Sequence, residues 1–243
     1  MKIFITDGSV TSFFTAVFDA YTEKECLITS DRQVQLTLDS EIIAVSSDSQ
    51  KCDRVRRGIS KYDMHAEEEV SLALRCCDKR REQIAFEYIK ILIKAKAPVR
   101  SRLNLTEVLQ FKDIMHKVTD ETHKLTGFLR FMECDGGVLY APYSPDNNIT
   151  DLLMRHFAAR LRAEKFIIHD IKRKIAGIYN GETWTLCYAD RAEICLSENE
   201  KSFENLWKKY YKAVNIAERP HEKQMKGYMP VRYWKFLPEK RED

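Results

Sequence analysis

Two histidines and two arginines are the residues best suited to acid–base chemistry on an anionic substrate. His123 lies near the end of one predicted helix, and His156 lies on another, four residues before Arg160. An imidazole exchanges protons near neutral pH, and a guanidinium can hold a phosphate. One hypothesis is therefore a metal-free enzyme acting on a nucleotide or DNA end, in which the histidines transfer protons and Arg130 and Arg160 bind the anion. It requires the four side chains to share one pocket.

A purely structural interpretation of the helix "LLMRHFAARL" competes with that hypothesis. His156 and Arg160 share a stripe with leucines at helical spacing, so a histidine at the edge of the core and an arginine with a buried stem also explain the pattern. Arg130, in the predicted strand "GFLRFMEC", lies on the side of apolar neighbours and needs a partner there. A carboxylate or a ligand phosphate would serve.

Cations alternate with aromatic rings near the C-terminus. Trp207, Tyr210 and Val214 have the spacing of a helix face packed in a core. Basic residues off that stripe could contact phosphates while an exposed Tyr233 or Trp234 stacks on an unpaired base. We expect Trp234 to be buried and Tyr233 to be partly exposed, although both could instead be anchors of a protein-interaction scaffold. The predicted nucleic-acid contacts are Arg130, Arg160, Lys208, Lys209, Lys212, Arg219, Arg232, Tyr233 and Trp234.

Metal and cofactor motifs are missing from the sequence. The stretch "HAEEE" at His65 begins like a zinc deaminase motif, but only Cys76 and Cys77 follow, without the proline and spacer that build the metal site. The seven cysteines include no C-x-x-C pair, and the eight glycines form no phosphate-binding or nucleophile motif. The sequence therefore predicts no metal site and no cofactor.

The elements that position these residues predict an α+β fold. Residues 2–6 predict a strand followed by a helix capped by Ser9, and "EIIAVSSDSQ" predicts a second strand before a helical region that runs to Lys96. Pro98 marks the boundary between a mainly helical region, residues 1–97, and an α+β domain, residues 98–243. In that domain, helices alternate with about five strands, including hairpins at "DGG" and "NG", which predicts an antiparallel sheet covered by helices.

Bulk composition limits the class of protein. Forty Lys and Arg residues against thirty-seven Asp and Glu give a net charge of +3, so any basic surface must be local. The 44% hydrophobic content is enough for a core in a chain of 243 residues. Without a signal peptide or a long apolar segment, the sequence predicts a cytoplasmic protein with no membrane contact.

The chain also resembles a known family of uncharacterised bacterial domains. The resemblance rests on "HKLTGFLRF", "YSPDNNI", "RHFAARL", "LWKKYYKAVNIAER" and "MPVRYWKFLPE", and it extends to "DGSVTSFFTAVFDAY" and "SDSQKCDRVRRGI" near the N-terminus. One departure is Phe166, where fused relatives have the tryptophan of "WSI". The matching positions are His123, Arg130, Pro145, Asp146, His156, Arg160, Arg219, Met229, Pro230, Tyr233 and Trp234.

The resemblance implies a role in DNA metabolism. Such domains are fused to UdgX-type uracil-DNA glycosylases, or stand alone and are encoded beside a radical-SAM protein of DNA modification or repair. The expected function is therefore an accessory protein of DNA repair that binds nucleic acid and acts with a radical-SAM partner. The resemblance carries no catalytic residue over to this chain, because the glycosylase's own reactive residues belong to another domain.

Overall fold

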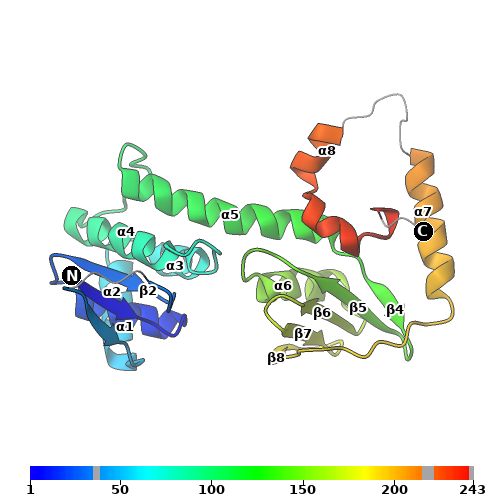
Figure 1. Cartoon of the computed structure of the whole chain (residues 1–243), viewed down its shortest axis with the longest axis horizontal. Helices are drawn as coiled ribbons and strands as arrows, with labels where there is room; N and C mark the ends of the chain where they lie inside the picture. The colour runs from blue at the N-terminus through cyan, green and yellow to red at the C-terminus, as the bar shows by residue number, and fades with distance from the viewer. Residues whose placement is uncertain (35–38, 215–221, 241–243) are drawn as a thin grey trace. The chain divides into compact units, whose positions relative to one another are not determined.

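The computed structural model describes residues 1–34, 39–214 and 222–240, and the chain divides into two compact units, residues 1–119 and 120–243 (Figure 1). The predicted α+β class is confirmed. The predicted boundary at residues 97 and 98 lies between two helices of the first unit, and as a boundary between folding domains it stays a prediction. Among the described residues, no helix has both the length and the apolar character needed to cross a membrane.

A three-stranded parallel sheet forms the centre of the first unit. Its order is β2-β1-β3, so the chain crosses over the central strand between its second and third strands. The strands are β1 (Lys2–Ile5), β2 (Cys26–Thr29) and β3 (Glu41–Ala44), and the helices are α1 (Val10–Ala20), α2 (Ser49–Ser60), α3 (Ala66–Ala73), α4 (Arg81–Ala95) and α5 (Thr106–Phe128), whose last residues belong to the second unit.

The predicted first strand and the helix after it are confirmed as β1 and α1, whereas the strand β2 was not predicted. Ser9 caps α1, since its hydroxyl accepts a hydrogen bond from the backbone amide of Ser12 at 3.1 Å. The short edge strand β2 was not predicted; the Gln83 side chain of α4 accepts a hydrogen bond from the Ile28 amide at 2.9 Å. The long helical region predicted up to Lys96 is divided into α2, α3 and α4.

A five-stranded sheet with the order β4-β5-β6-β7-β8 forms the second unit. Its pairs are antiparallel except β5 with β6, which are parallel because α6 connects them as a crossover helix. The sheet is therefore mainly antiparallel, as predicted, with one parallel pair that was not. Its elements are β4 (Met132–Cys134), β5 (Val138–Tyr143), α6 (Thr150–Arg160), β6 (Phe166–Asp170), β7 (Ile175–Tyr179) and β8 (Trp184–Tyr188).

Both predicted hairpins form, and their turns use glycine at positive φ. Gly136 and Gly137 in the β4–β5 turn have φ values of 78° and 71°, which side chains with a Cβ rarely adopt. In the second hairpin, the turn between the paired residues Tyr179 and Trp184 is longer than the predicted two-residue type. Asn180 stabilises it, because its side-chain oxygen accepts hydrogen bonds from the next two backbone amides beyond Gly181.

One face of the sheet packs against α6 through a glycine. A Cβ placed on Gly177 of β7 would lie 2.4 Å from the sulfur of Met154 and 2.5 Å from its Cγ. Met154 is fully buried, so its side chain has little room to move away. The absence of a side chain at Gly177 is what lets α6 approach the sheet this closely.

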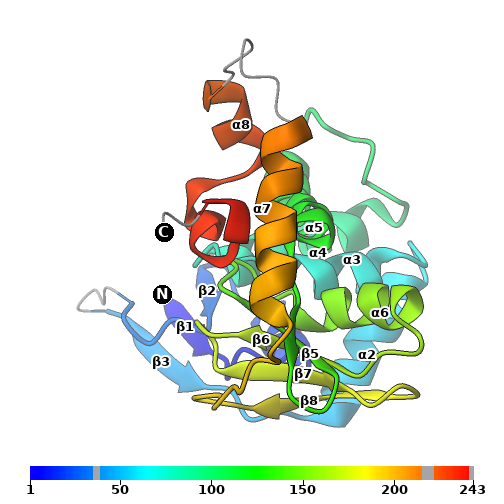
Figure 2. The ribbon, with the colours of Figure 1, turned by 90° about the vertical axis from the view of Figure 1, so that its right-hand side faces the viewer.

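The C-terminal segment adds helices beside β4, the strand at one edge of the sheet. Figure 2 shows α7 standing beside the last short helical turns, and α7 also contacts β4. The 3₁₀ turns η1 and η2 thereby bring the end of the described chain against α7. These elements are α7 (Glu200–Val214), α8 (Glu222–Tyr228), η1 (Val231–Phe236) and η2 (Pro238–Lys240).

We predict that Gly177→Ala lowers the free energy of unfolding of the second unit by about 1–3 kcal/mol, because the new methyl group overpacks the contact with Met154. Tryptophan fluorescence during urea denaturation measures this unit alone, since the three tryptophans, Trp184, Trp207 and Trp234, all lie in it. The control is Gly127→Ala in α5, where no atom lies within 4 Å of the added Cβ. Because alanine favours a helix more than glycine does, this change should raise the free energy of unfolding by roughly 0.5–1 kcal/mol. Equal effects of the two changes would contradict the packing argument.

Candidate functional site

A buried carboxylate organises the second unit beneath its C-terminal segment. Glu121, near the end of α5, is only 4% exposed, and its oxygens accept hydrogen bonds from the backbone amides of Asp146 at 2.9 Å and Asn147 at 2.7 Å. The Asn147 side-chain amide donates a further bond at 2.7 Å. From η1, the hydroxyl of Tyr233 and the guanidinium of Arg232 also donate to Glu121. One carboxylate thus joins α5, the loop before α6 and the end of the chain.

These donors decide the ionisation of Glu121. Burial by itself raises the pKa of the carboxyl, but the hydrogen bonds from Tyr233, from the two backbone amides and from Arg232 outweigh it, and the net pKa is lowered. The pKa of Tyr233 is raised, first by burial and then by its bond to the carboxylate. The pair is therefore an ionised carboxylate and a neutral phenol at neutral pH.

The two adjacent aromatic residues have the reverse of the expected burial. Tyr233 is 2% exposed, so its ring cannot stack on a base, whereas Trp234 is half-buried. The Trp234 indole N–H donates to the carbonyl of Met229 at 3.0 Å. The expectation failed because both rings are equally apolar, and only Tyr233 carries a hydroxyl that can reach the buried Glu121. Tyr233 is thus removed from the predicted nucleic-acid contacts.

Arg232 is exposed but its charge is compensated. Its Nη2 lies 3.0 Å from the carboxylate of Asp146 and 3.3 Å from Glu121, and its guanidinium lies over the ring of Tyr233. A phosphate would have to compete with these two carboxylates. Arg219, another predicted contact, lies outside the described residues.

The partner that Arg130 requires is a carboxylate. Its Nη2 lies 2.9 Å from Glu239 in η2, whose side chain is buried, and its guanidinium stacks over the indole of Trp207 at 4.9 Å from the ring centroid. The indole N–H donates to the other oxygen of Glu239 at 2.8 Å. Glu239 thus holds η2 against both α7 and the segment before β4.

The predicted histidine and arginine site does not assemble in the described part of the chain. His123 lines a hollow with residues of α8, including Tyr228, whereas Arg130 lines a different hollow against α7. On α6, His156 is exposed with its ring against Phe157, and Arg160 is also exposed. No hydrogen bond or ion pair between described residues joins these groups. Nor does any group of three or more His, Cys, Asp or Glu side chains among them have the arrangement to hold a metal ion.

The apolar stripe of α7 was predicted to be packed in the core, and this prediction is wrong. Leu206 is 60% exposed, and Glu200 is the only buried residue of this helix. Helical spacing shows which side chains share a face, but it cannot show whether another element covers that face. The exposed members of the stripe are Phe203, Leu206, Trp207, Tyr210 and Val214.

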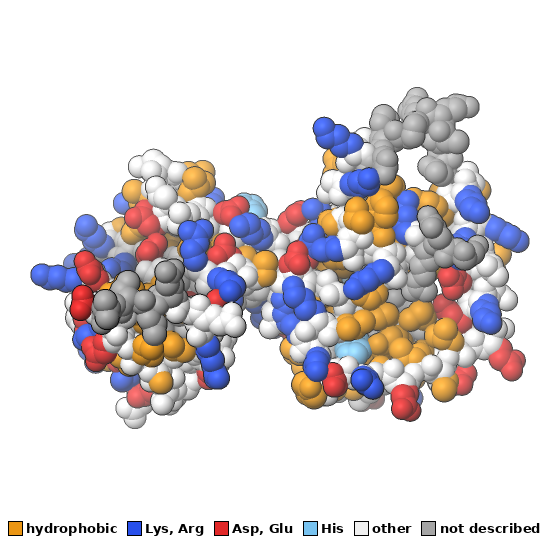
Figure 3. Space-filling view, in the orientation of Figure 1, with side chains coloured by type: hydrophobic (Ala, Val, Ile, Leu, Met, Phe, Trp, Pro, Cys, Tyr) orange, Lys and Arg blue, Asp and Glu red, His pale blue; other side chains and the backbone are white. Residues whose placement is uncertain are grey.

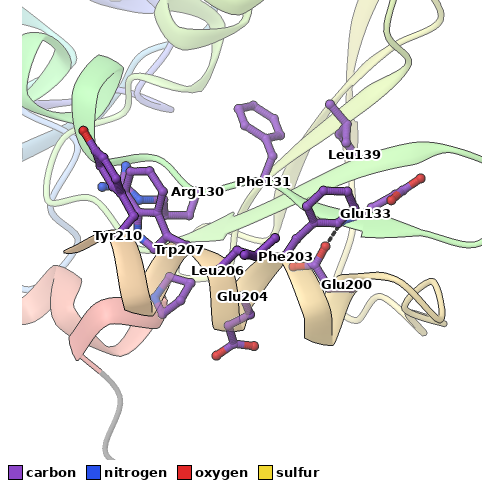
Figure 4. Close-up of a pocket in the computed structure, with 11 residues that line it drawn as sticks. Arg130, Phe131, Glu133, Leu139, Glu200, Phe203, Glu204, Leu206, Trp207 and Tyr210 are labelled. Carbon is purple, nitrogen blue, oxygen red and sulfur yellow. Dashed lines mark hydrogen bonds between the residues drawn. The ribbon is translucent and has the colours of Figure 1, made fainter. Parts of the chain in front are cut away.

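An open groove of about 720 Å³ lies between this stripe and the start of the sheet. Figure 4 shows Phe203, Leu206 and Trp207 of α7 on one side, Phe131 and Leu139 on the other, and Arg130 toward one end. Carboxylates line the groove as well, and Glu200 accepts a hydrogen bond from the backbone amide of Glu133 at 2.7 Å. The groove is apolar along its length and carries acidic side chains at one end.

The opposite side of α7 is basic. Lys201, Lys209 and Lys212 are exposed on it, and we call them the basic ridge. Lys208 falls on the same side by helical spacing, but its side chain is largely covered and lies 3.6 Å from Glu204. Sequence reasoning found the other lysines but not Lys201, which falls on the same side by helical spacing.

A cation and two aromatic rings adjoin this ridge. The Nζ of Lys240 in η2 lies 5.0 Å from the ring centroid of Tyr211 and 5.2 Å from that of Trp234. Both rings are half-buried, so part of each is accessible to solvent. We call Tyr211, Trp234 and Lys240 the aromatic cluster. It was missed because Lys240 and Tyr211 are far apart in sequence.

Two residues that hold the site together were also missed: Glu121 and Glu239. Glu121 did carry a signal, since it falls between Val118 and Leu125 on the buried side of α5, where a carboxylate needs several donors. Glu239 carried none, because its burial depends on how η2 folds back onto Arg130 and α7.

Comparison with protein families gives a match. A family model described as a domain of unknown function (DUF4130) matches residues 79–239, which include α4, α5 and nearly all of the second unit. No curated protein matches the chain.

We predict that Glu121→Gln lowers the free energy of unfolding of the second unit by about 3 kcal/mol at neutral pH, because it removes the charge that balances the buried donors. The wild-type pKa is lowered, so the stabilisation is present above the unfolded value of about 4.3 and is lost as pH falls through the folded value. The wild type should therefore lose more stability than the variant between about pH 5 and pH 3.

Tryptophan fluorescence during urea denaturation at each pH measures both effects. The control is Asp120→Asn, the same chemical change on the neighbouring exposed residue, which should alter stability by less than about 0.5 kcal/mol. A Glu121→Gln protein with the wild-type pH profile would show that the carboxylate is not ionised in the folded state.

Proposed function

The chain belongs to the DUF4130 family, and from this premise we propose that it is an accessory protein of DNA metabolism that binds single-stranded nucleic acid through α7 and η2. The resemblance of its motifs to domains that accompany DNA-repair enzymes supports the link to DNA. The contact surface in this proposal consists of the basic ridge and the aromatic cluster.

One observation carries the binding proposal: exposed lysines and a half-buried aromatic ring occur on the same helix, α7. Lys209 and Lys212 are exposed, and the ring centroid of Tyr211 lies 5.0 Å from the Nζ of Lys240. Proteins that bind single strands combine cations that follow the phosphates with rings on which bases stack. Trp234 is also partly accessible to solvent, whereas Tyr233 is buried.

The charge distribution favours a local contact. Figure 3 shows hydrophobic side chains over the second unit, at the right, with Lys and Arg on several sides of them and Asp and Glu toward the right edge. With a net charge of only +3, the chain has no general attraction for polyanions. Binding should therefore depend on a few lysines, be modest in affinity, and weaken as salt rises.

The proposal includes a partner enzyme. The separation of His123, His156 and Arg130 gives no support to acid–base chemistry by this chain. In the proposed role, the chain holds a strand while the radical-SAM protein implied by the resemblance modifies or repairs it. After co-expression and nuclease treatment, such a partner should remain bound to the chain.

We predict that the protein binds a fluorescein-labelled oligo(dT) of about 20 nucleotides at low salt, with a fluorescence anisotropy change that reports the affinity. The double variant Lys209→Glu/Lys212→Glu should bind on the order of tenfold more weakly. The slope of log affinity against log salt should fall by about 1.4, because two phosphate contacts are lost on a single strand.

The matched control is Lys24→Glu/Lys94→Glu, which changes the net charge equally at two exposed lysines of the first unit. It should leave the affinity nearly unchanged. If the wild type shows no binding at low salt, the proposed function is wrong. If both double variants lose binding equally, the basic ridge is not the contact surface.

A further inference from the structure

A hollow of about 490 Å³ lies in the first unit, between the last turns of α1 and the helices α2 and α4 (Figure 1). Val17, Phe18, Val55 and Ile93 all line it, so much of its surface is apolar. Small-molecule sites are hollows of this size and character, with a few polar groups that fix the orientation of the ligand. The polar groups of the hollow therefore decide what it can bind.

Gly58 keeps one wall of the hollow open. It lies inside α2, where glycine is less favourable than alanine. A Cβ at this position would meet no atom within 4 Å, so close packing is not what requires a glycine here. The position lies one helical turn after Arg54 and on the same face of the helix. A large side chain would instead occupy the hollow beside Arg54.

Arg54 supplies a positive charge that no carboxylate in the described part of the chain neutralises. Its side chain is exposed, and its guanidinium carbon lies 5.4 Å from the ring centroid of Phe18. Lys51 lies over the same ring at 5.7 Å, but its Nζ is bound to Asp19 at 2.7 Å. A guanidinium that rests on an aromatic ring keeps its N–H groups available for a phosphate.

Two further polar side chains line the hollow, Asp19 and Thr22. The carboxylate of Asp19 is bound to Lys51 through one oxygen and can accept more hydrogen bonds, and the exposed Thr22 hydroxyl can both donate and accept. The ring of Tyr21, which is 40% exposed, adjoins them. The hollow thus combines aromatic and aliphatic walls, partners for hydroxyl groups, and one cation without a carboxylate.

We propose that this hollow binds a nucleoside monophosphate. The base packs against the apolar wall and the rings of Phe18 and Tyr21, the sugar hydroxyls bind Asp19 and Thr22, and the phosphate binds Arg54. A purine should bind more tightly than a pyrimidine, because it buries more ring surface. The site belongs to the first unit, whereas the basic ridge and the aromatic cluster belong to the second, so it does not depend on the proposed single-strand binding.

The test is calorimetric titration of the full-length protein with adenosine monophosphate up to about 1 mM. Adenosine should bind on the order of tenfold more weakly, and inorganic phosphate more weakly still, because each makes only part of the contacts. Arg54→Gln should weaken binding of the nucleotide on the order of tenfold and leave the affinity for adenosine unchanged. This pattern would assign the guanidinium to the phosphate.

Two further variants test the position of the site. Arg57→Gln removes the same charge from an exposed arginine of α2 that does not line the hollow, and it should leave the affinity unchanged. Gly58→Leu should abolish binding of both the nucleotide and adenosine, because its side chain occupies the hollow. The melting temperature of this variant should not fall, since the new Cβ meets open space and leucine favours a helix.

Three outcomes would overturn the proposal. They are no heat of binding with adenosine monophosphate at about 1 mM, equal losses of affinity in Arg54→Gln and Arg57→Gln, and full binding by a folded Gly58→Leu protein. Adenosine that binds as tightly as its monophosphate would also overturn it, because Arg54 would then bind no phosphate. A protein that binds adenosine monophosphate but not oligo(dT) would confirm this site while the proposed single-strand binding fails.

Discussion

The second unit depends on the buried carboxylate of Glu121. An ionised group at 4% exposure is tolerated only when its lone pairs are satisfied, and here two backbone amides, an asparagine, a tyrosine and an arginine supply the donors. Because these donors come from the loop before α6 and from η1, the carboxylate fixes where the chain's last turns lie. The position of Trp234, and with it the aromatic cluster, follows from that bond.

A second buried carboxylate, that of Glu239, positions α7 in the same way. Glu239 binds both Arg130 and the indole N–H of Trp207, so η2 holds the middle of the helix while its apolar stripe stays open. The helix is thereby presented with two different faces: lysines on one side and uncovered aromatic and aliphatic side chains on the other. The helix therefore leaves two chemically different sets of side chains exposed to solvent.

Compensation by acidic groups decides which cations can take part in function. Arg130 and Arg232 were attractive candidates because each lies in a distinctive motif, yet each is paired with a carboxylate. Lys209 and Lys212 occupy an ordinary helical pattern and are exposed. In a chain with nearly balanced charge, the ion pairs formed on folding neutralise some of the cations, and motif strength does not predict which ones.

The sequence by itself determined the α+β class, the two hairpins, the capped first helix and the amphipathic pattern of α7, because these depend on local spacing and turn residues. Tertiary structure alone decided that Tyr233 is buried beside Glu121, that Glu239 neutralises Arg130, and that Lys240 lies over Tyr211 and Trp234. It also decided that the α7 stripe is uncovered and that the two histidines lie apart. Periodicity records which residues share a face, whereas burial and ion pairing depend on segments distant in sequence that only the folded chain brings together.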